Sequence, residues 1–310
     1  MPVHIRLAEA GDYPSLADLH NSHNPFELTA EQLRRFDHRS ESVDPHFRRA
    51  VAVAGGRLVA AGEIRARWAD TVQPGRYWVA AQLADPAGCQ GPGVQLVSWL
   101  AASIRADVRE LAACIRSDYL SRMPWLLKLG FTERFVSWGA HLDLTTFDFA
   151  AHEAVPRRLE DAGYRFVAYP ELELADKERQ LRQLQEHINQ DVLSFEPIVP
   201  SGRSSVLAPD YLPAGLIIAL DPGGRFIGFS SLRQESVGGP LENGLTGVHR
   251  AYRGKGVATA VKVRALEVAR SLGATGIGTG GGGRDSPMKH LNRKLGFTTG
   301  PDWVTLISER

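Results

Sequence analysis

Hydrophobic and polar residues follow one order of predicted elements in each half of the chain. In the second half, the stretch "GLIIALDPGGRFIGFSSL" at 215–232 has two apolar runs, rich in β-branched and aromatic residues, on either side of a glycine turn, and this predicts a hairpin. Apolar residues then recur at helical spacing from Val257 to Leu272, and Gly273 is placed to end that helix. A strand, a glycine-rich turn, a helix and another strand in succession predict a parallel pair inside an otherwise antiparallel sheet.

Three short motifs recur in the same order and at nearly constant separation. They are "GGR" at 55–57 and 223–225, Gln/Arg-x-x-Gly at 90–93 and 253–256, and "KLGF" at 128–131 and 294–297. One such match could be chance, but their shared order predicts two copies of one fold. We place the copies at 1–147 and 148–310. The predicted fold class is α/β (α+β), with a mixed, mostly antiparallel sheet flanked by helices in each copy.

The turn in "VHRAYRGKGVATAVKVRAL" at 248–266 has the composition of an anion site. Gly254 and Gly256 allow the backbone to approach a ligand closely, and the first turn of the following helix leaves N–H groups without partners. Arg253 and Lys255 add donors suited to phosphate. The pattern therefore predicts a pyrophosphate site at the start of this helix.

Two other nucleotide motifs do not fit this turn. The P-loop pattern requires glycine where His249 stands and Ser or Thr after Lys255, and the chain has neither. The dinucleotide pattern G-x-G-x-x-G requires a third glycine where Thr259 stands; its matches within 276–283 reflect only the glycine density of "GIGTGGGG".

Composition excludes several classes of protein. The 310 residues are 43% hydrophobic and 23% charged, with a net charge of +1, so no overall charge favours nucleic acid or an anionic membrane. No apolar run approaches the roughly 18 residues of a membrane span. The only cysteines are Cys89 and Cys114, and the start of the chain lacks a signal peptide's apolar core, so we expect a reduced, cytoplasmic protein. A disulfide between them is disfavoured, and no His or Cys spacing predicts a metal site.

The residues of the second half resemble a known family. Arg253-x-x-Gly256-x-Ala258, followed by "NRKLGF" at 292–297, resembles the acetyl-CoA motif and C-terminal signature of the GNAT N-acetyltransferase superfamily. The stretch "TGGGGRDSPMKHLNRKLGF" at 279–297 is similar to the family's T-x-N-x-x-x-N-x-P-M version of that region. The resemblance covers most of 215–310, and the tandem arrangement resembles two-domain members of the mycothiol synthase-like type.

The resemblance implies acetyl-CoA as co-substrate, with its pyrophosphate on the turn and its pantetheine arm against the backbone of Val248. Asp285 stands where many relatives carry Asn. The segment "TGGGG" is either a surface loop or a passage for the pantetheine arm. The implied cofactor-binding residues are Val248, Arg253, Gly254, Lys255, Gly256, Val257, Ala258, Thr259 and Asp285.

Two residues are candidates for the chemistry of acetyl transfer. Glu242 matches the position of the general base in mycothiol synthase-like proteins, although a solvated glutamate at the start of a strand is an equal interpretation. Asn292 stands where the family commonly carries a tyrosine acid. An amide can donate a hydrogen bond but cannot deliver a proton, so the thiolate would depart with help from solvent or a backbone N–H.

The first copy has lost parts of the motif. Gln90 and Gly93 remain, but Pro92 removes a backbone donor, Gln95 stands where a small residue is needed, and Leu126 occupies the tyrosine position. We therefore expect an N-acetyltransferase whose second copy acts on an unidentified small-molecule or peptide amine, while the first binds acetyl-CoA weakly or not at all. The alternatives are a mycothiol synthase-like acetyltransferase and a non-catalytic acyl-CoA-binding sensor or interaction protein.

Overall fold

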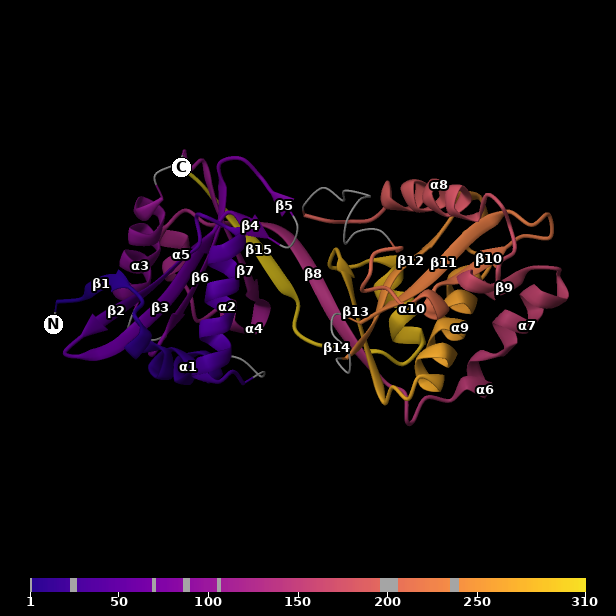
Figure 1. Ribbon diagram of the computed structural model, residues 1–310, viewed down its shortest axis with the longest axis horizontal. Coiled ribbons are helices and arrows are strands. Elements are labelled where there is room, and N and C mark those ends of the chain that lie inside the picture. Colours follow the sequence, from indigo (N-terminus) through magenta and orange to yellow (C-terminus); the bar gives the residue numbers. More distant parts are fainter. Residues whose placement is uncertain are drawn as a thin grey trace. The chain divides into compact units, whose positions relative to one another are not determined.

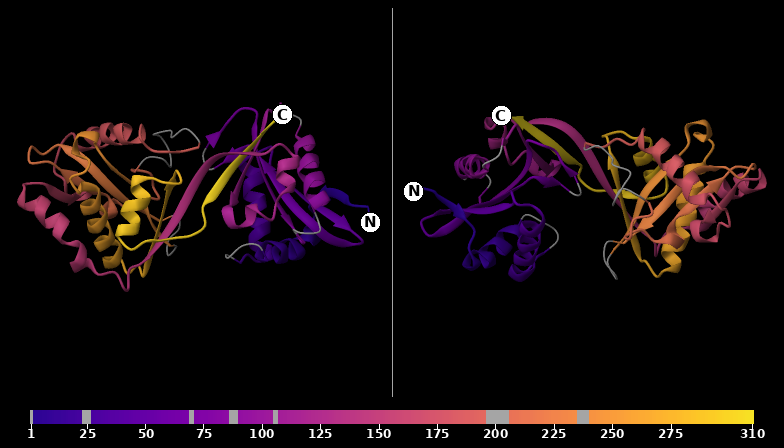
Figure 2. Two further views of the ribbon diagram at one scale, coloured as in Figure 1. Left: turned by 180° about the vertical axis from the view of Figure 1, so that it is seen from behind. Right: turned by 45° about the horizontal axis from the view of Figure 1, so that its top comes forward.

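The computed structural model describes residues 2–22, 27–68, 71–85, 90–104, 107–195, 206–234 and 240–310. They form two compact units, 1–135 with 303–310 and 136–302. Strand β8 (Thr132–Asp143) begins in the first unit and ends in the second, while β15 (Trp303–Glu309), drawn in yellow, lies among the strands of the first unit (Figure 1, Figure 2). The units are thus divided differently from the predicted copies, because the last strand of each copy contributes to the other unit.

The first unit is a mixed sheet with helices on both faces. Its strands follow the order β1-β2-β3-β6-β7-β15, and only the β6–β7 pair is parallel. Ala61 on β3 packs with α1 and α2, whereas its neighbour Gly62 lies against α3, which places these helices on opposite faces. The elements are β1 (His4–Leu7), η1 (Ala10–Asp12), α1 (Tyr13–Asn21), α2 (Ala30–Val43), β2 (Arg48–Ala54), β3 (Arg57–Arg65), β4 (Arg67–Trp68), β5 (Thr71–Val72), β6 (Arg76–Leu83), α3 (Gln90–Ser103), β7 (Glu110–Arg116), α4 (Ser117–Leu120) and α5 (Trp125–Lys128).

The second unit repeats this arrangement. The end of β8 is followed across the sheet by β13, β12, β11, β10 and β9, and only β12–β13 is parallel. The remaining elements are α6 (Phe149–His152), α7 (Ala154–Asp161), β9 (Arg165–Ala168), η2 (Tyr169–Glu171), α8 (Lys177–Asn189), η4 (Pro213–Gly215), β10 (Ile217–Leu220), β11 (Phe226–Arg233), β12 (Leu241–Val248), η5 (Arg250–Tyr252), α9 (Val257–Ser271), β13 (Gly276–Gly282), α10 (Pro287–Lys294) and β14 (Thr298–Thr299).

Two apolar cores hold the helices of the second unit to its sheet (Figure 1). On one face, α9 buries Val257, Val261 and Leu266 against β10, β11 and β12. On the other face, α8 buries Leu184 and Ile188 against β11 and β12. The sheet therefore separates an α9 side from an α8 side, and both sides bear on the site described below.

The structure confirms the predicted fold class and several local elements. The hairpin at 215–232 forms as β10 and β11, and both predicted parallel pairs are present. Gly130 and Gly296, the glycines of the two "KLGF" motifs, have φ values of 76° and 83° and end equivalent short helices. No helix among the described residues combines the length and apolar character needed to cross a membrane.

Candidate functional site

The parallel strands β12 and β13 separate along their length and form a fork. They pair only at Leu241–Ile277 and Glu242–Gly278, although β12 continues to Val248. Beyond Glu242, the edge of β12 that faces β13 therefore carries backbone groups without a ladder partner on that strand. Such an edge can pair with amide groups of an extended ligand.

The glycine turn lies at the open end of this fork. Gly254 and Gly256 both adopt the left-handed conformation, with φ values of 76° and 96°. A Cβ on Gly256 would lie 2.7 Å from the Val155 side chain, so this position requires glycine for space as well as for conformation. No side chain caps α9, which leaves the N–H groups of its first turn available to an anion.

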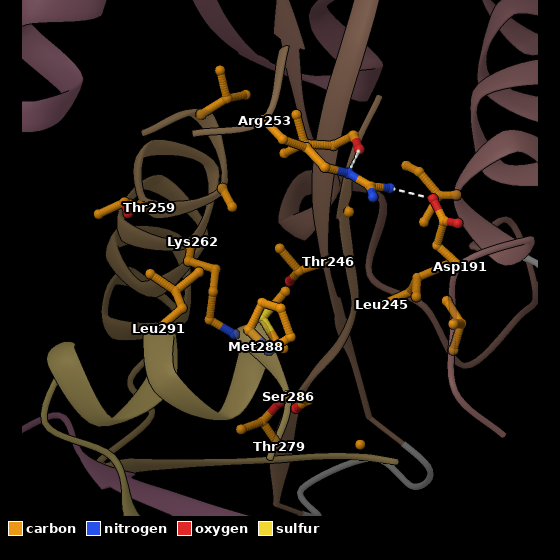
Figure 3. A pocket seen from close by; sticks show the side chains of 18 of the residues that line it. Asp191, Leu245, Thr246, Arg253, Thr259, Lys262, Thr279, Ser286, Met288 and Leu291 are labelled. Atoms are coloured by element: carbon orange, nitrogen blue, oxygen red, sulfur yellow. Dashed lines mark hydrogen bonds and ion pairs between the residues drawn. The ribbon is translucent and has the colours of Figure 1, made fainter. Parts of the chain in front are cut away.

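One cavity of about 530 Å³ joins the turn to the fork (Figure 3). Its walls come from β12, the turn, the first two turns of α9, the end of β13 and the start of α10, and also from Trp138 of β8 and from the end of α8 with the residues 191–193 that follow it. Seven of the nine predicted cofactor-binding residues line it, namely Val248, Arg253, Gly254, Gly256, Val257, Ala258 and Thr259. The glycines of "TGGGG" at 280–282 also line it, consistent with a passage on this side.

An arginine pair and an aspartate stand at the mouth of the cavity. Arg253 donates from Nη2 to Asp191 at 2.5 Å and from Nε to the carbonyl of Val248 at 3.1 Å (Figure 3). Arg250 donates to the same carboxylate at 2.5 and 2.9 Å. Hydrogen bonds from Arg250 and Arg253 hold the pKa of Asp191 well below its usual range. Asp191 was not among the predicted site residues, because it follows the end of α8 and reaches the turn from a distant part of the chain.

A buried polar network lies at the apex of the fork. Asn243 donates through its side-chain amide to Ser230 Oγ at 2.8 Å and to the Ser231 carbonyl at 2.9 Å, and Lys262 of α9 donates to its Oδ1. Ser230 Oγ lies 2.9 Å from Thr246 Oγ1. Lys262 and Thr246 also line the cavity, so the network connects the core to its wall.

Two of the predicted residues do not line the cavity. Lys255 is exposed and its Nζ lies over the ring of Tyr252, 5.0 Å from the centroid. Asp285 has a side chain that is 81% exposed and pairs with His290 at 2.9 Å. Nothing in the geometry supports the implied contact of Asp285 with the cofactor.

The two candidate catalytic residues lie close to the fork but outside the cavity lining. Glu242 is the last paired residue of β12; it points to the α8 side and receives hydrogen bonds from Arg233 at 2.5 and 2.7 Å. Asn292 of α10 is fully buried, and neither polar atom of its side chain has a hydrogen-bond partner. Among the residues that the structure describes, no three His, Cys, Asp or Glu side chains gather as metal ligands.

Among the residues that the structure describes, the corresponding place in the first unit holds a smaller cavity. Its cavity, between β6, β7 and the start of α5, measures only about 180 Å³. Trp125 is 1% exposed and Leu126 is buried beside it, and a Cβ on Gly93 would lie 3.0 Å from the Trp125 ring. Cys114 lines this cavity, and burial raises the pKa of its thiol; Cys89 lies outside the described residues.

Most of the residues that form this site match the model of a known protein family. Residues 182–297 match the model of the acetyltransferase (GNAT) family. No protein of curated function matches the sequence.

Solved structures match the whole length of the chain. A GCN5-related N-acetyltransferase from Sphaerobacter thermophilus is 18% identical with a TM-score of 0.68, over 99% of this chain and 95% of that one. A tandem GNAT protein from the clavulanic acid biosynthesis pathway is 18% identical with a TM-score of 0.55, over 99% and 98%. A glucosamine N-acetyltransferase region of a fungal multi-domain β-N-acetylglucosaminidase is 12% identical with a TM-score of 0.68, over 99% and 38%. These likenesses confirm the tandem fold.

Proposed function

We propose that the C-terminal unit, whose residues 182–297 match the acetyltransferase (GNAT) family model, transfers the acetyl group of acetyl-CoA to an amine. The observation that carries the proposal is the continuous cavity of about 530 Å³ that extends from the glycine turn to the apex of the β12–β13 fork. A long ligand with a phosphate at one end and amides along its arm matches both ends of that cavity.

The chain offers distinct groups for each part of acetyl-CoA. The N–H groups of the first turn of α9, with Arg253, suit the pyrophosphate. The free edge of β12, from Gly244 to Val248, offers backbone donors and acceptors to the two amides of the pantetheine arm. This arrangement directs the thioester toward the apex of the fork, beside Thr246 and Thr279.

Glu242 is the proposed general base. It ends the paired part of β12 and faces the α8 side, while the cofactor cavity reaches the apex between α9 and the segment that follows α8. An amine that approached from the α8 side would meet Glu242 and its partner Arg233 first. If Glu242 takes the proton of the amine, Glu242→Gln lowers kcat, whereas full activity across pH would remove this assignment.

The proposed acceptor is a small-molecule or peptide amine. Amino sugars belong among the amines tested, because one structural neighbour is named as a glucosamine N-acetyltransferase region and because the tandem arrangement resembles mycothiol synthase-like proteins. The first unit, whose described equivalent cavity is smaller and has Trp125 in its wall, is proposed to serve as scaffold without a cofactor. A cytoplasmic location is proposed from the scarcity of cysteine.

The test combines binding and turnover. Isothermal titration calorimetry with acetyl-CoA measures the site, and a thiol-release assay over a panel of amino sugars, polyamines and peptides measures transfer. Arg253→Glu should abolish both, and Arg293→Glu, the same change on an exposed part of α10, should affect neither. Binding without transfer to any amine would favour a non-catalytic acyl-CoA-binding protein.

A further inference from the structure

Lys262 is a buried lysine in the wall of the proposed cofactor cavity. It lies on α9 between the buried residues Val261 and Val263 and is itself only 1% exposed. Its side chain extends from α9 toward Thr246 and Met288 (Figure 3). Its Nζ donates to Asn243 Oδ1 and lies 5.3 Å from the centroid of the Phe297 ring.

No counter-charge accompanies this ammonium. Within the described part of the chain, Lys262 forms no ion pair, and burial lowers its pKa to about 7. The other ionisable side chains of the cavity wall are Asp191, which is held ionised by arginines, Arg253, and Tyr252, whose hydrogen bond to Asp221 raises its pKa. On α10, Lys289 is also buried, and it is paired with Asp302 at 2.9 Å. Among the residues of this wall that the structure describes, Lys262 is therefore the one whose side chain can exchange a proton near neutral pH.

The ammonium is held at the apex of the fork. Asn243 and Thr279 are the first residues of β12 and β13 beyond the last paired positions, and Thr279 Oγ1 donates to the Asn243 carbonyl at 3.0 Å across the gap. Lys262 Nζ donates to the side chain of Asn243. The ammonium therefore lies where the pantetheine arm of CoA would end if that arm extended from the glycine turn along β12. That end of the arm carries the sulfur.

The chain offers no obvious acid in the usual place. Asn292 cannot deliver a proton, and its buried amide does not line the cavity. A thiolate released into this mostly apolar cavity would be costly without a proton or a positive charge beside it.

Resting on the proposed function, we propose that Lys262 Nζ donates the proton to the departing sulfur of CoA. As the bond between the acceptor nitrogen and the acyl carbon forms and the carbon–sulfur bond breaks, the sulfur takes a proton from Nζ and leaves as a thiol. The acceptor nitrogen loses a proton to solvent as it becomes an amide, and the neutral Lys262 amine takes up a proton from solvent. Protons balance over the cycle, and no further reactant is required.

The test does not depend on the unidentified acceptor. Ammonium beside the sulfur stabilises thiolate, so the thiolate absorbance of bound CoA should appear about 1 to 3 pH units lower in the wild-type protein than in Lys262→Met. Desulfo-CoA complexes of each protein provide the baseline. Lys289→Met, which removes a buried lysine that does not line the cavity, should leave the thiol titration unchanged.

Each outcome has a separate meaning. Absence of CoA binding to the wild-type protein by calorimetry would overturn the proposed function itself. Binding with equal thiol titrations in wild type and Lys262→Met would overturn only the role of Lys262. Acetylation of Lys262 by acetyl-CoA, seen by mass spectrometry, would also overturn it, because the amine would then be a nucleophile.

A measurement on the wild-type protein covers the case in which Lys262→Met does not fold. Lysine Nζ can be titrated by ¹⁵N NMR in complexes with CoA and with desulfo-CoA. Its pKa should be higher with CoA, since a thiolate beside it favours the ammonium. Equal values would refute contact between Lys262 and the sulfur.

Discussion

Replacement of Lys262 by Met should make the second unit more stable at neutral pH, although it removes a hydrogen bond. The pKa of Lys262 lies at about 7 in the folded protein, against an ordinary value of 10.5. That difference corresponds to about 5 kcal/mol, by which protonation of the buried amine weakens folding. Met fills a similar volume without charge, but it leaves Asn243 Oδ1 with only the Thr246 hydroxyl at 3.5 Å, at a cost of about 1 to 3 kcal/mol. The variant should therefore be more stable by about 2 to 4 kcal/mol at and below pH 7.

The sign of the pH dependence follows from the direction of the shift. Because the folded protein holds this proton less tightly than the unfolded chain, the cost is fully present below about pH 7 and is relieved as pH rises toward 10.5. The stability difference between Lys262→Met and wild type should fall by about 2.3 kcal/mol between pH 7, where the folded-state amine is half protonated, and pH 9. This change is independent of the lost hydrogen bond.

Hydrogen exchange of the α9 amides measures the prediction. Opening free energies of the two proteins are compared at equal pH from 6 to 9, so that intrinsic exchange rates cancel. A difference that stays constant with pH, or a variant less stable than wild type throughout, would refute the assignment of Lys262 as an unpaired buried amine.

Three further predictions concern the turn, its mouth and the first unit. Gly254→Ala should cost about 1 to 2 kcal/mol of stability, because it places a side chain at positive φ in open space. Gly256→Ala should cost more and also weaken CoA binding, because its Cβ meets Val155. Equal losses of stability in urea unfolding would contradict the steric argument. Asp191→Asn should tighten CoA binding up to about fivefold by releasing Arg253, and weaker binding in calorimetry would show that the aspartate instead positions that arginine. Trp125→Ala should destabilise the first unit by about 3 to 5 kcal/mol and leave the affinity for CoA unchanged. A loss of affinity would show that CoA binding depends on the first unit.

Local features of the site could be predicted from the sequence because they depend on neighbouring residues. The glycine turn, the helix that follows it and the stop at Gly273 are encoded within one stretch, and Gly273 indeed adopts a φ of 84°. The same holds for the "KLGF" glycines, which take up equivalent conformations in both units.

Features made by distant segments could not be predicted in this way. Lys262 belongs to a series of charged residues on α9, which the pattern alone presents as a polar face. It is nevertheless buried, because α9 packs on β11 and β12, where Asn243 accepts a hydrogen bond from Nζ. Asp191, which follows the end of α8, pairs with Arg253 from a distant part of the sequence. The exchange of β8 and β15 between units likewise depends on pairings that no hydrophobic pattern specifies.

The central claim is that acetyl-CoA binds only to the second unit, at the glycine turn and the β12–β13 fork. Isothermal titration calorimetry of the full chain with acetyl-CoA tests it most directly. We predict one site per chain, lost in Arg253→Glu and retained in Arg293→Glu. Two equivalent sites, or unchanged binding in Arg253→Glu, would contradict the account.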